Sequence, residues 1–378
     1  MSVRGARFED GALVVVAEAR DEAHGEALLS LPTVTARHRA LPWFELSTFG
    51  DVRRERELVL RLGGDPGDAF RAQQEAWRRG ELQAAPEVSA ILRFGRDVAK
   101  APLDAWEVVP GLWLLPLRTP TLPPATHTNT FLVVQGDEAV FVEPASSDPD
   151  EIAKALSLVD ALGVRVCAIA VTHHHPDHAP GAAAMQAAWN APLYAHPVTS
   201  QLLGFEAAGL DVVPMDEGDM LALGGTDVLR AHFTPGHAPG HLCFQHLPSE
   251  LLIAGDMVAG ISTILIDPDE GDMNRYLAEL DRLQNLDGTL IPAHGGWTLD
   301  GAALLKRTAD HRRAREAKVC EALERIQPAA LTDLVPIVYA DVPKALHGLA
   351  GRSLLSHLLG LKAREAAVEA DGRWRLSA

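Results

Sequence analysis

Four side chains that commonly bind transition metals occur within six residues, directly after an apolar run. The run covers residues 168–172, and the segment after it reads His173-His-His-Pro-Asp-His178. Histidines two residues apart in an extended segment point to the same side, so His173 and His175 can bind one ion. Asp177 and His178 can then turn toward a neighbouring ion. The alternative is a polar loop whose histidines cap the next helix, but four ligands this close together are rare by chance, and we expect one loop that serves two metals.

Three further ligand candidates each follow a short apolar run of the kind that forms a strand. They are His237 in Thr-Pro-Gly-His, Asp256 in Ala-Gly-Asp and His294 in Pro-Ala-His. Taken singly, each would more often be an ordinary loop residue than a ligand. Residues at strand ends converge on one edge of a sheet, where α/β proteins tend to build their sites. The recurrence therefore predicts that the seven residues meet in one site.

Such a site has a definite chemistry. Two divalent cations about 3.5–4 Å apart can deprotonate a shared water, and the hydroxide can attack a carbonyl or phosphoryl centre while a metal polarises the oxygen that gains charge. Asp177 stands where it could orient that hydroxide or accept its proton. Imidazole and carboxylate ligands without thiolates suit Zn²⁺ and also fit Mn²⁺ or Fe²⁺. The expected cofactors are two divalent metal ions, with zinc as the first choice.

The elements that must position these residues alternate between strands and helices from about residue 106 onward. Turn residues and β-branched content predict the strands, and helical spacing of apolar residues predicts the helices. The predicted strands cover residues 112–117, 130–134, 139–142, 166–171, 193–195, 228–233, 251–254 and 289–291. The predicted helices cover residues 152–162, 181–189, 273–284 and 301–326. This alternation indicates a layered α/β architecture.

Residues 317–378 follow a different pattern. Helical stretches there precede an apolar run at 367–370, an Asp371-Gly372 turn and a second run at 373–376. Helices followed by a hairpin in this order are typical of a winged helix. The predicted domains are therefore an N-terminal domain (1–104), a catalytic domain (105–305) and a winged-helix-like domain (306–378).

The ligand motifs together resemble those of the metallo-β-lactamase superfamily. They read His-x-His-x-Asp-His at 173–178, Thr-Pro-Gly-His at 234–237, Gly-Asp at 255–256, and a final histidine at 294. The resemblance implies an αββα sandwich, flanked here by the winged helix and a small N-terminal α/β domain. It also implies two metal positions with these ligands: His173, His175 and His237 at the first, Asp177, His178 and His294 at the second, and Asp256 bridging them. Asp177 and Asp256 would then be the two catalytic carboxylates.

Four residues beside these motifs have more than one interpretation. His174 lies between ligands and should point away from them, so we expect a structural or supporting role. His241 could contact substrate, orient a ligand or serve the structure alone. Asn129 could contact substrate or cap the start of a strand. Glu143 begins a Glu-Pro-Ala segment where relatives usually carry Asp and Gly, so the ligand geometry could be shifted.

Two branches of the superfamily resemble different parts of the chain. Asp310-His-Arg-Arg-Ala-Arg-Glu316 and the winged-helix tail resemble a branch whose animal member is a mitochondrial lactamase-like endoribonuclease, which implies RNA cleavage. Segments 172–178 and 234–244 instead resemble glyoxalase II thioesterases, although residues 257–261 lack the Gly-Cys-Gly-Arg expected there. β-Lactamase or lactonase activity stays open. Oxygen reduction is disfavoured, because His175 stands where flavodiiron proteins carry Glu.

The charge distribution bears on the choice of substrate. The net charge of -17 is concentrated in residues 117–299, which hold 6 Lys and Arg against 23 Asp and Glu, whereas residues 300–378 hold 13 against 10. An acidic body repels polyanions, so a small-molecule or acyl substrate is favoured over nucleic acid. The leading hypothesis is a dinuclear hydrolase of an ester, thioester or phosphodiester. A metal-stabilised binding module acting through the winged helix is the non-enzymatic alternative, and a homodimer remains open.

Residues 1–104 carry the weakest signal. Segment 56–63 resembles the core of a Nudix box and segment 77–82 the part that closes such domains, but the metal-binding glutamates expected near 60 and 61 are Leu60 and Arg61. The region is therefore either a degenerate Nudix-like domain or an unrelated small α/β domain. The first eleven residues lack a signal-peptide pattern, and no apolar run approaches the roughly 20 residues of a membrane span. We expect no membrane partner and a cytoplasmic location.

Overall fold

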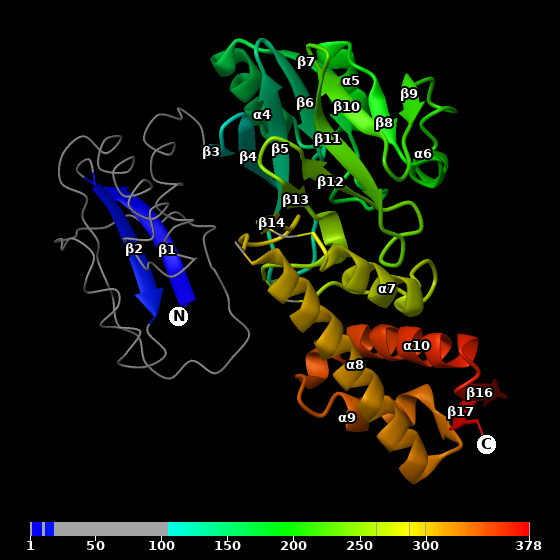
Figure 1. Cartoon of the computed structure of the whole chain (residues 1–378). Coiled ribbons are helices and arrows are strands. Elements are labelled where there is room, and N and C mark those ends of the chain that lie inside the picture. Colours follow the sequence, from blue (N-terminus) through cyan, green and yellow to red (C-terminus); the bar gives the residue numbers. More distant parts are fainter. Residues whose placement is uncertain are drawn as a thin grey trace.

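The computed structural model describes residues 2–9, 12–18 and 105–377, apart from residues 262, 287 and 299 (Figure 1). At the start of the chain, β1 (Ser2–Glu9) and β2 (Ala12–Glu18) pair as an antiparallel hairpin. The two Nudix-like segments, 56–63 and 77–82, lie outside the described residues.

Two sheets form the centre of the part from residue 105 onward, with the strand orders β3-β4-β5-β6-β7-β8-β9 and β10-β11-β12-β13-β14. The first contains β3 (Trp106–Val109), β4 (Leu112–Arg118), β5 (His127–Gln135), β6 (Glu138–Val142), β7 (Arg165–Ala170), β8 (Leu193–Ala195) and β9 (Val212–Pro214). The second contains β10 (Met220–Leu223), β11 (Thr226–Phe233), β12 (Leu242–His246), β13 (Leu251–Ile253) and β14 (Leu290–Ile291). Pairing is antiparallel from β3 to β6 and from β10 to β13, and parallel from β6 to β9 and between β13 and β14.

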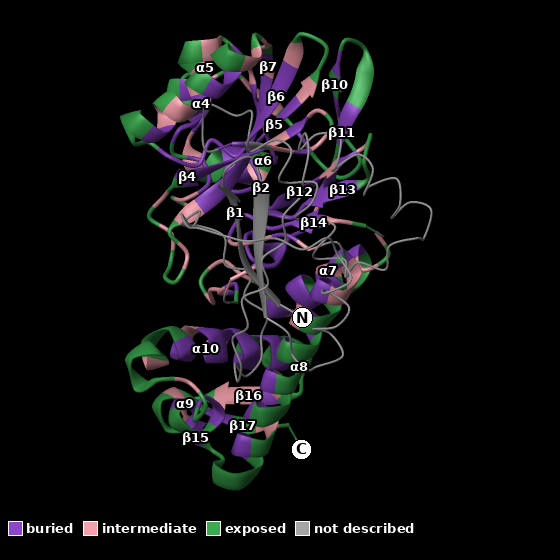
Figure 2. Ribbon diagram, turned by 90° about the vertical axis from the view of Figure 1, so that its left-hand side faces the viewer, coloured by how far each residue is buried: buried purple, intermediate pink, exposed green. Residues whose placement is uncertain are grey.

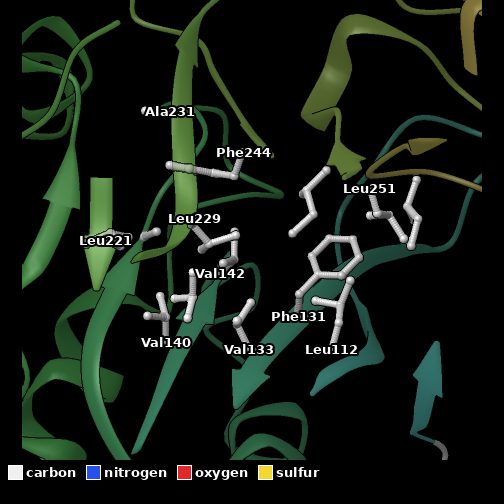
Figure 3. Packing of buried hydrophobic residues seen from close by; sticks show 14 of the residues in the cluster. Leu112, Phe131, Val133, Val140, Val142, Leu221, Leu229, Ala231, Phe244 and Leu251 are labelled. Atoms are coloured by element: carbon white, nitrogen blue, oxygen red, sulfur yellow. The ribbon is translucent and has the colours of Figure 1, made fainter. Parts of the chain in front are cut away.

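Both sheets are packed against other elements on their two faces. Successive residues of a strand point to opposite sides, so neighbouring residues enter different cores. In β6, Val140 and Val142 belong to the core between the sheets, whereas Phe141 packs among the helices outside the first sheet. The core between the sheets also contains Leu229 and Phe244 of the second sheet (Figure 3). Each such buried side chain contributes about 1.5–3 kcal/mol to stability. This shared core holds the two sheets face to face.

Helices cover the outer face of each sheet. The helices are α4 (Pro149–Leu162), α5 (Ala182–Trp189), α6 (Pro197–Leu203), α7 (Met273–Leu283) and α8 (Gly301–Ile326). Leu158 of α4 and Met185 of α5 pack against the first sheet, and Tyr276 of α7 and Leu305 of α8 pack against the second. Buried residues accordingly line the sheets and the inward faces of these helices (Figure 2). The expected αββα sandwich is confirmed.

A winged helix follows the sandwich. Its elements are the C-terminal part of α8, β15 (Ala329–Ala330), α9 (Leu331–Val338), α10 (His347–Ala363), β16 (Ala367–Ala370) and β17 (Arg373–Leu376). The three strands form a small sheet in the order β15-β17-β16, and Val319, Leu354 and Trp374 share its core. The predicted helices and hairpin are confirmed. The predicted domain boundary at 305/306 lies inside α8, and the domain limits stay predictions.

Several short elements were not predicted from the sequence. The most important is β12 (Leu242–His246), which lies in the middle of the second sheet. Two Pro-Gly pairs precede it, at 235–236 and 239–240, and they made this region resemble a loop. β5 also begins at His127, three residues before its predicted start at residue 130, because its first residues pair with the end of β4. Among the described residues, no helix combines the length and apolar character that crossing a membrane requires.

One glycine leaves no room for a side chain next to the ligand-bearing loop. A Cβ at Gly181 would lie 2.4 Å from the carbonyl oxygen of Ser146 and 2.9 Å from that of Pro144, whereas Gly348 in α10 has open space around it. Overpacking of this kind costs about 1–3 kcal/mol. We predict that Gly181→Ala lowers the free energy of unfolding by about 2 kcal/mol, while Gly348→Ala leaves it unchanged or raises it by at most about 1 kcal/mol. Parallel denaturant titrations test this, and equal stability of the two variants would contradict it.

Candidate metal centre

The structure brings the seven predicted ligands together at the ends of four strands. The segment from His173 to His178 follows β7, His237 follows β11, and His294 follows β14. Asp256 lies in a single 3₁₀ turn (Gly255–Met257) directly after β13. The side chains form three overlapping groups with the spacing of metal donors: His173, His175 and His237; His173, His178 and Asp256; and Asp177, His178 and His294.

The first group consists of three imidazole nitrogens. His175 Nδ1 lies 3.0 Å from both His173 Nε2 and His237 Nε2, and these two nitrogens are 3.3 Å apart. Around a tetrahedral zinc ion with bonds of about 2.0–2.1 Å, neighbouring donors lie roughly 3.3–3.4 Å from each other. The three nitrogens therefore have the spacing of donors around one ion.

We call Asp177, His178 and His294 the second group, and with Asp256 it combines carboxylates and imidazoles. Asp177 Oδ2 lies 3.4 Å from His294 Nε2, and Asp177 Oδ1 lies 3.6 Å from His178 Nε2. Asp256 lies between the two groups, because its Oδ2 is 3.4 Å from His237 Nε2 and its Oδ1 is 3.4 Å from His294 Nε2. One carboxylate thus faces the donors of both groups.

Hydrogen bonds behind the histidines determine which nitrogen faces the site. His237 Nδ1 donates to the carbonyl of Leu265 (2.9 Å), and His294 Nδ1 donates to that of His127 (3.1 Å). A carbonyl oxygen can only accept, so these nitrogens carry the protons and the other nitrogens present lone pairs inward. Burial and the neighbouring rings also hold the pKa of His237 well below its usual range, which favours the neutral ring. Inward lone pairs are what a metal ion requires.

Two atoms that face the site, His178 Nε2 and Asp256 Oδ1, are buried and have no hydrogen-bond partner among the described residues, and the outward His178 Nδ1 has none either. A buried polar atom without a partner costs about 1–3 kcal/mol, and carboxylates and lone pairs that face one another also repel. Divalent cations between these donors would remove both costs. The donor set therefore fits two such ions.

Glu143 lies next to histidines of both groups, on the side away from the proposed ions. Its buried Oε1 accepts from Thr172 Oγ1 (3.0 Å) and lies 3.3 Å from His178 Nδ1, and the same hydroxyl lies 2.9 Å from His173 Nδ1. Burial raises the pKa of Glu143 to about 8. Its backbone is left-handed (φ 74°), a conformation that costs a non-glycine residue about 1–2 kcal/mol. The longer side chain that departs from the family pattern therefore still reaches the histidines.

His241 and Asn129 hold the loops that carry ligands. The fully buried His241 accepts the backbone N–H of Asp256 at Nε2 (3.0 Å), and its Nδ1 lies 2.7 Å from Thr234 Oγ1. Asn129 Nδ2 donates to the carbonyls of Pro292 and Gly295, both at 2.9 Å, on either side of His294. These contacts match the ligand-orienting interpretation of His241 and a structural role for Asn129. Substrate contact by either residue stays a prediction.

Glu270, which was not among the predicted site residues, also contacts the site. Its carboxylate accepts from His175 Nε2 (2.5 Å) and from His174 Nε2 (2.7 Å), and these hydrogen bonds lower the pKa of Glu270 to about 2. His174 thus shares a carboxylate with the outward nitrogen of His175, and its structural or supporting role stays a prediction. The only hint in the sequence was the acidic run at 267–270, and such runs are usually solvated surface.

Comparison with solved structures supports the architecture. A metallo-β-lactamase family protein from Thermus thermophilus superposes with a TM-score of 0.59, covering 71% of this chain and 100% of that one at 22% identity. A β-lactamase domain protein from Burkholderia ambifaria gives a TM-score of 0.62, covering 74% and 96% at 22% identity. At this level of identity the likeness shows the fold alone.

Sequence relatives include the lactamase-like protein adaB of Aspergillus niger, 28% identical over 52% of this chain and 59% of that protein. The atrochrysone carboxyl ACP thioesterase of Aspergillus fumigatus is 27% identical over 53% and 61%. The chain thus spans about three fifths of the length of these relatives.

Residues 123–295 match the family described as the metallo-beta-lactamase superfamily, and residues 331–374 match the beta-lactamase associated winged helix domain. The chain therefore contains a metallo-β-lactamase superfamily domain followed by the winged helix domain that accompanies such domains.

Proposed function

We propose that this chain is a hydrolase that uses two divalent metal ions, with zinc as the first choice, to cleave a thioester or ester of an acyl substrate. The observation that carries the proposal is the shared position of Asp256 between two groups of donors spaced 3.0–3.7 Å apart. His173, His175 and His237 would hold the first ion. Asp177, His178 and His294 would hold the second.

Bound ions would supply a nucleophilic hydroxide near neutral pH and polarise the oxygen on which charge develops. The residues of the chain orient the donors and handle the proton. Although burial opposes it, His178 and His294 hold the pKa of Asp177 below its usual range, so this carboxylate is ionised and can accept a proton from the attacking water. Thr128 Oγ1 donates to the Asp177 carbonyl (2.8 Å) and fixes this loop.

Two observations favour an acyl substrate over RNA. The catalytic segment is strongly acidic, with 6 basic against 23 acidic residues in 117–299, and it repels a polyanion. One relative is named as an ACP thioesterase, which makes a thioester on a carrier protein the first substrate class to test. The glyoxalase II alternative is weaker, because a winged helix follows the sandwich here instead of the glutathione-binding helical domain expected of that family.

The first test is metal content. Protein purified without chelators should contain about two ions per chain. Asp256→Ala should hold one ion or fewer and lose at least about 100-fold in kcat/KM, because this carboxylate faces the donors of both groups. Asp160→Ala, which removes an exposed carboxylate on α4, is the matched control and should behave as wild type. Elemental analysis of the three proteins decides, and fewer than one ion per wild-type chain would refute a dinuclear site.

The second test is a substrate panel of acyl thioesters, aryl esters, a phosphodiester and single-stranded RNA. We expect the highest kcat/KM for a thioester, at least about tenfold above the phosphodiester. Asp177→Asn should lower thioester turnover by about 10²–10⁴-fold, because it keeps the shape but removes both the proton acceptor and a carboxylate ligand of the second ion. RNA or phosphodiester cleavage that dominates the panel and disappears in Asp256→Ala would establish the nuclease alternative, whereas cleavage that survives this substitution indicates a contaminant.

A further inference from the structure

Residues 263–272, which we call the connector, directly precede α7 and are the last part of the segment between the 3₁₀ turn that carries Asp256 and this helix. The connector supplies the acceptors behind two of the three histidines of the first group. The Leu265 carbonyl accepts from His237 Nδ1 (2.9 Å), and the Glu270 carboxylate accepts from His175 Nε2 (2.5 Å). The orientation of these two rings therefore depends on where the connector lies.

Side chains of the winged helix bind the other side of the connector. Arg352 of α10 donates to both carboxylate oxygens of Asp267 and to Asp269 Oδ2 (2.7 Å), and Ser356 one turn later donates to the Ile266 carbonyl. Ser356 is almost fully buried, and its hydroxyl has two acceptors, the Ile266 carbonyl and the Arg352 carbonyl of its own helix (3.2 Å). α10 also packs against α7, the helix that follows the connector (Figure 1).

The carbonyl groups of the connector alternate between the two sides. Those of Ile264 and Ile266 accept from Arg312 of α8 and Ser356 of α10, and that of Leu265 between them accepts from His237. Three consecutive carbonyls are therefore bonded alternately to helices α8 and α10 and to a ligand of the first group, which holds the connector on both sides. A shift that breaks the bonds to α8 and α10 must also move the acceptor of His237.

We propose that Arg352, Ser356 and Arg312 are positioning residues of the first metal site, which act on His175 and His237 through the connector. The winged helix then helps to build the metal centre and sets its affinity for one of the two ions. The second group should be insensitive, since His294 and His178 are supported by His127 and Glu143, outside the connector. The inference rests on the proposed function, in which the first group holds an ion.

The test compares two arginines of similar exposure. Arg352 and its partner Asp267 are 42% and 23% exposed, and Arg364, which binds Glu316 within the winged helix, is 41% exposed against 16% for its partner. Stepwise metal affinities are measured by competition with a chromophoric chelator, and Co²⁺ absorption reports the ligand geometry. Arg352→Ala should weaken one of the two ions by about 10–100-fold, change the Co²⁺ spectrum and leave the other ion within about threefold. Arg364→Ala should bind both ions as wild type does.

A His294→Ala background, in which only the first group is complete, assigns the weakened ion to that group. Unchanged affinities and spectrum in Arg352→Ala, with two ions bound to wild type, would overturn the positioning role. Fewer than one ion on wild type would instead overturn the proposed function. If Arg352→Ala does not fold, Ser356→Ala replaces it: a several-fold weaker ion restored by Ser356→Thr supports the inference, and wild-type affinity contradicts it.

Discussion

The mutual repulsion of buried donors is the constraint on which the rest of this structure depends. Five imidazole nitrogens and two carboxylates face one another at 3.0–3.7 Å, a geometry that suits donors around cations. The protein maintains this geometry from the far side of the five rings. A carbonyl, hydroxyl or carboxylate lies next to the outward nitrogen of each ring. The buried Glu143 and its left-handed backbone belong to this outer layer, and so does His241, which holds the backbone of Asp256.

The sandwich makes this arrangement possible because its two sheets contribute ligands from opposite sides of one core. β7 of the first sheet carries the His173 to His178 segment, and β11, β13 and β14 of the second carry the remaining three ligands. Asn129 at the start of β5 joins the sheets at the site itself, since it bonds to the loop around His294. Packing between the sheets and positioning of the ligands are thus parts of one structure.

The winged helix extends that structure. Its contacts with the sandwich concentrate on the connector and on α7, where Arg312, Arg352 and Ser356 approach carbonyls and carboxylates close to the ligands. The acidic surface of the catalytic segment and the near-neutral tail give the whole chain little electrostatic attraction for nucleic acid. A winged helix that supports the metal site through α8 and α10 is consistent with that charge distribution.

The sequence by itself determined the seven candidate ligands, a layered α/β class and the winged helix, because ligand chemistry and the periods of strands and helices are local properties. The αββα arrangement came from the resemblance of the ligand motifs to the superfamily. The sequence did not reveal β12, whose place in the sheet depends on pairing with β11 and β13. Only the tertiary structure identified Leu265, Glu270 and Arg352 as supports of the site. A backbone carbonyl carries no sequence signal, and the bonds of Glu270 to His175 and of Arg352 to Asp267 join residues 95 and 85 positions apart. Such contacts exist only once the chain has folded.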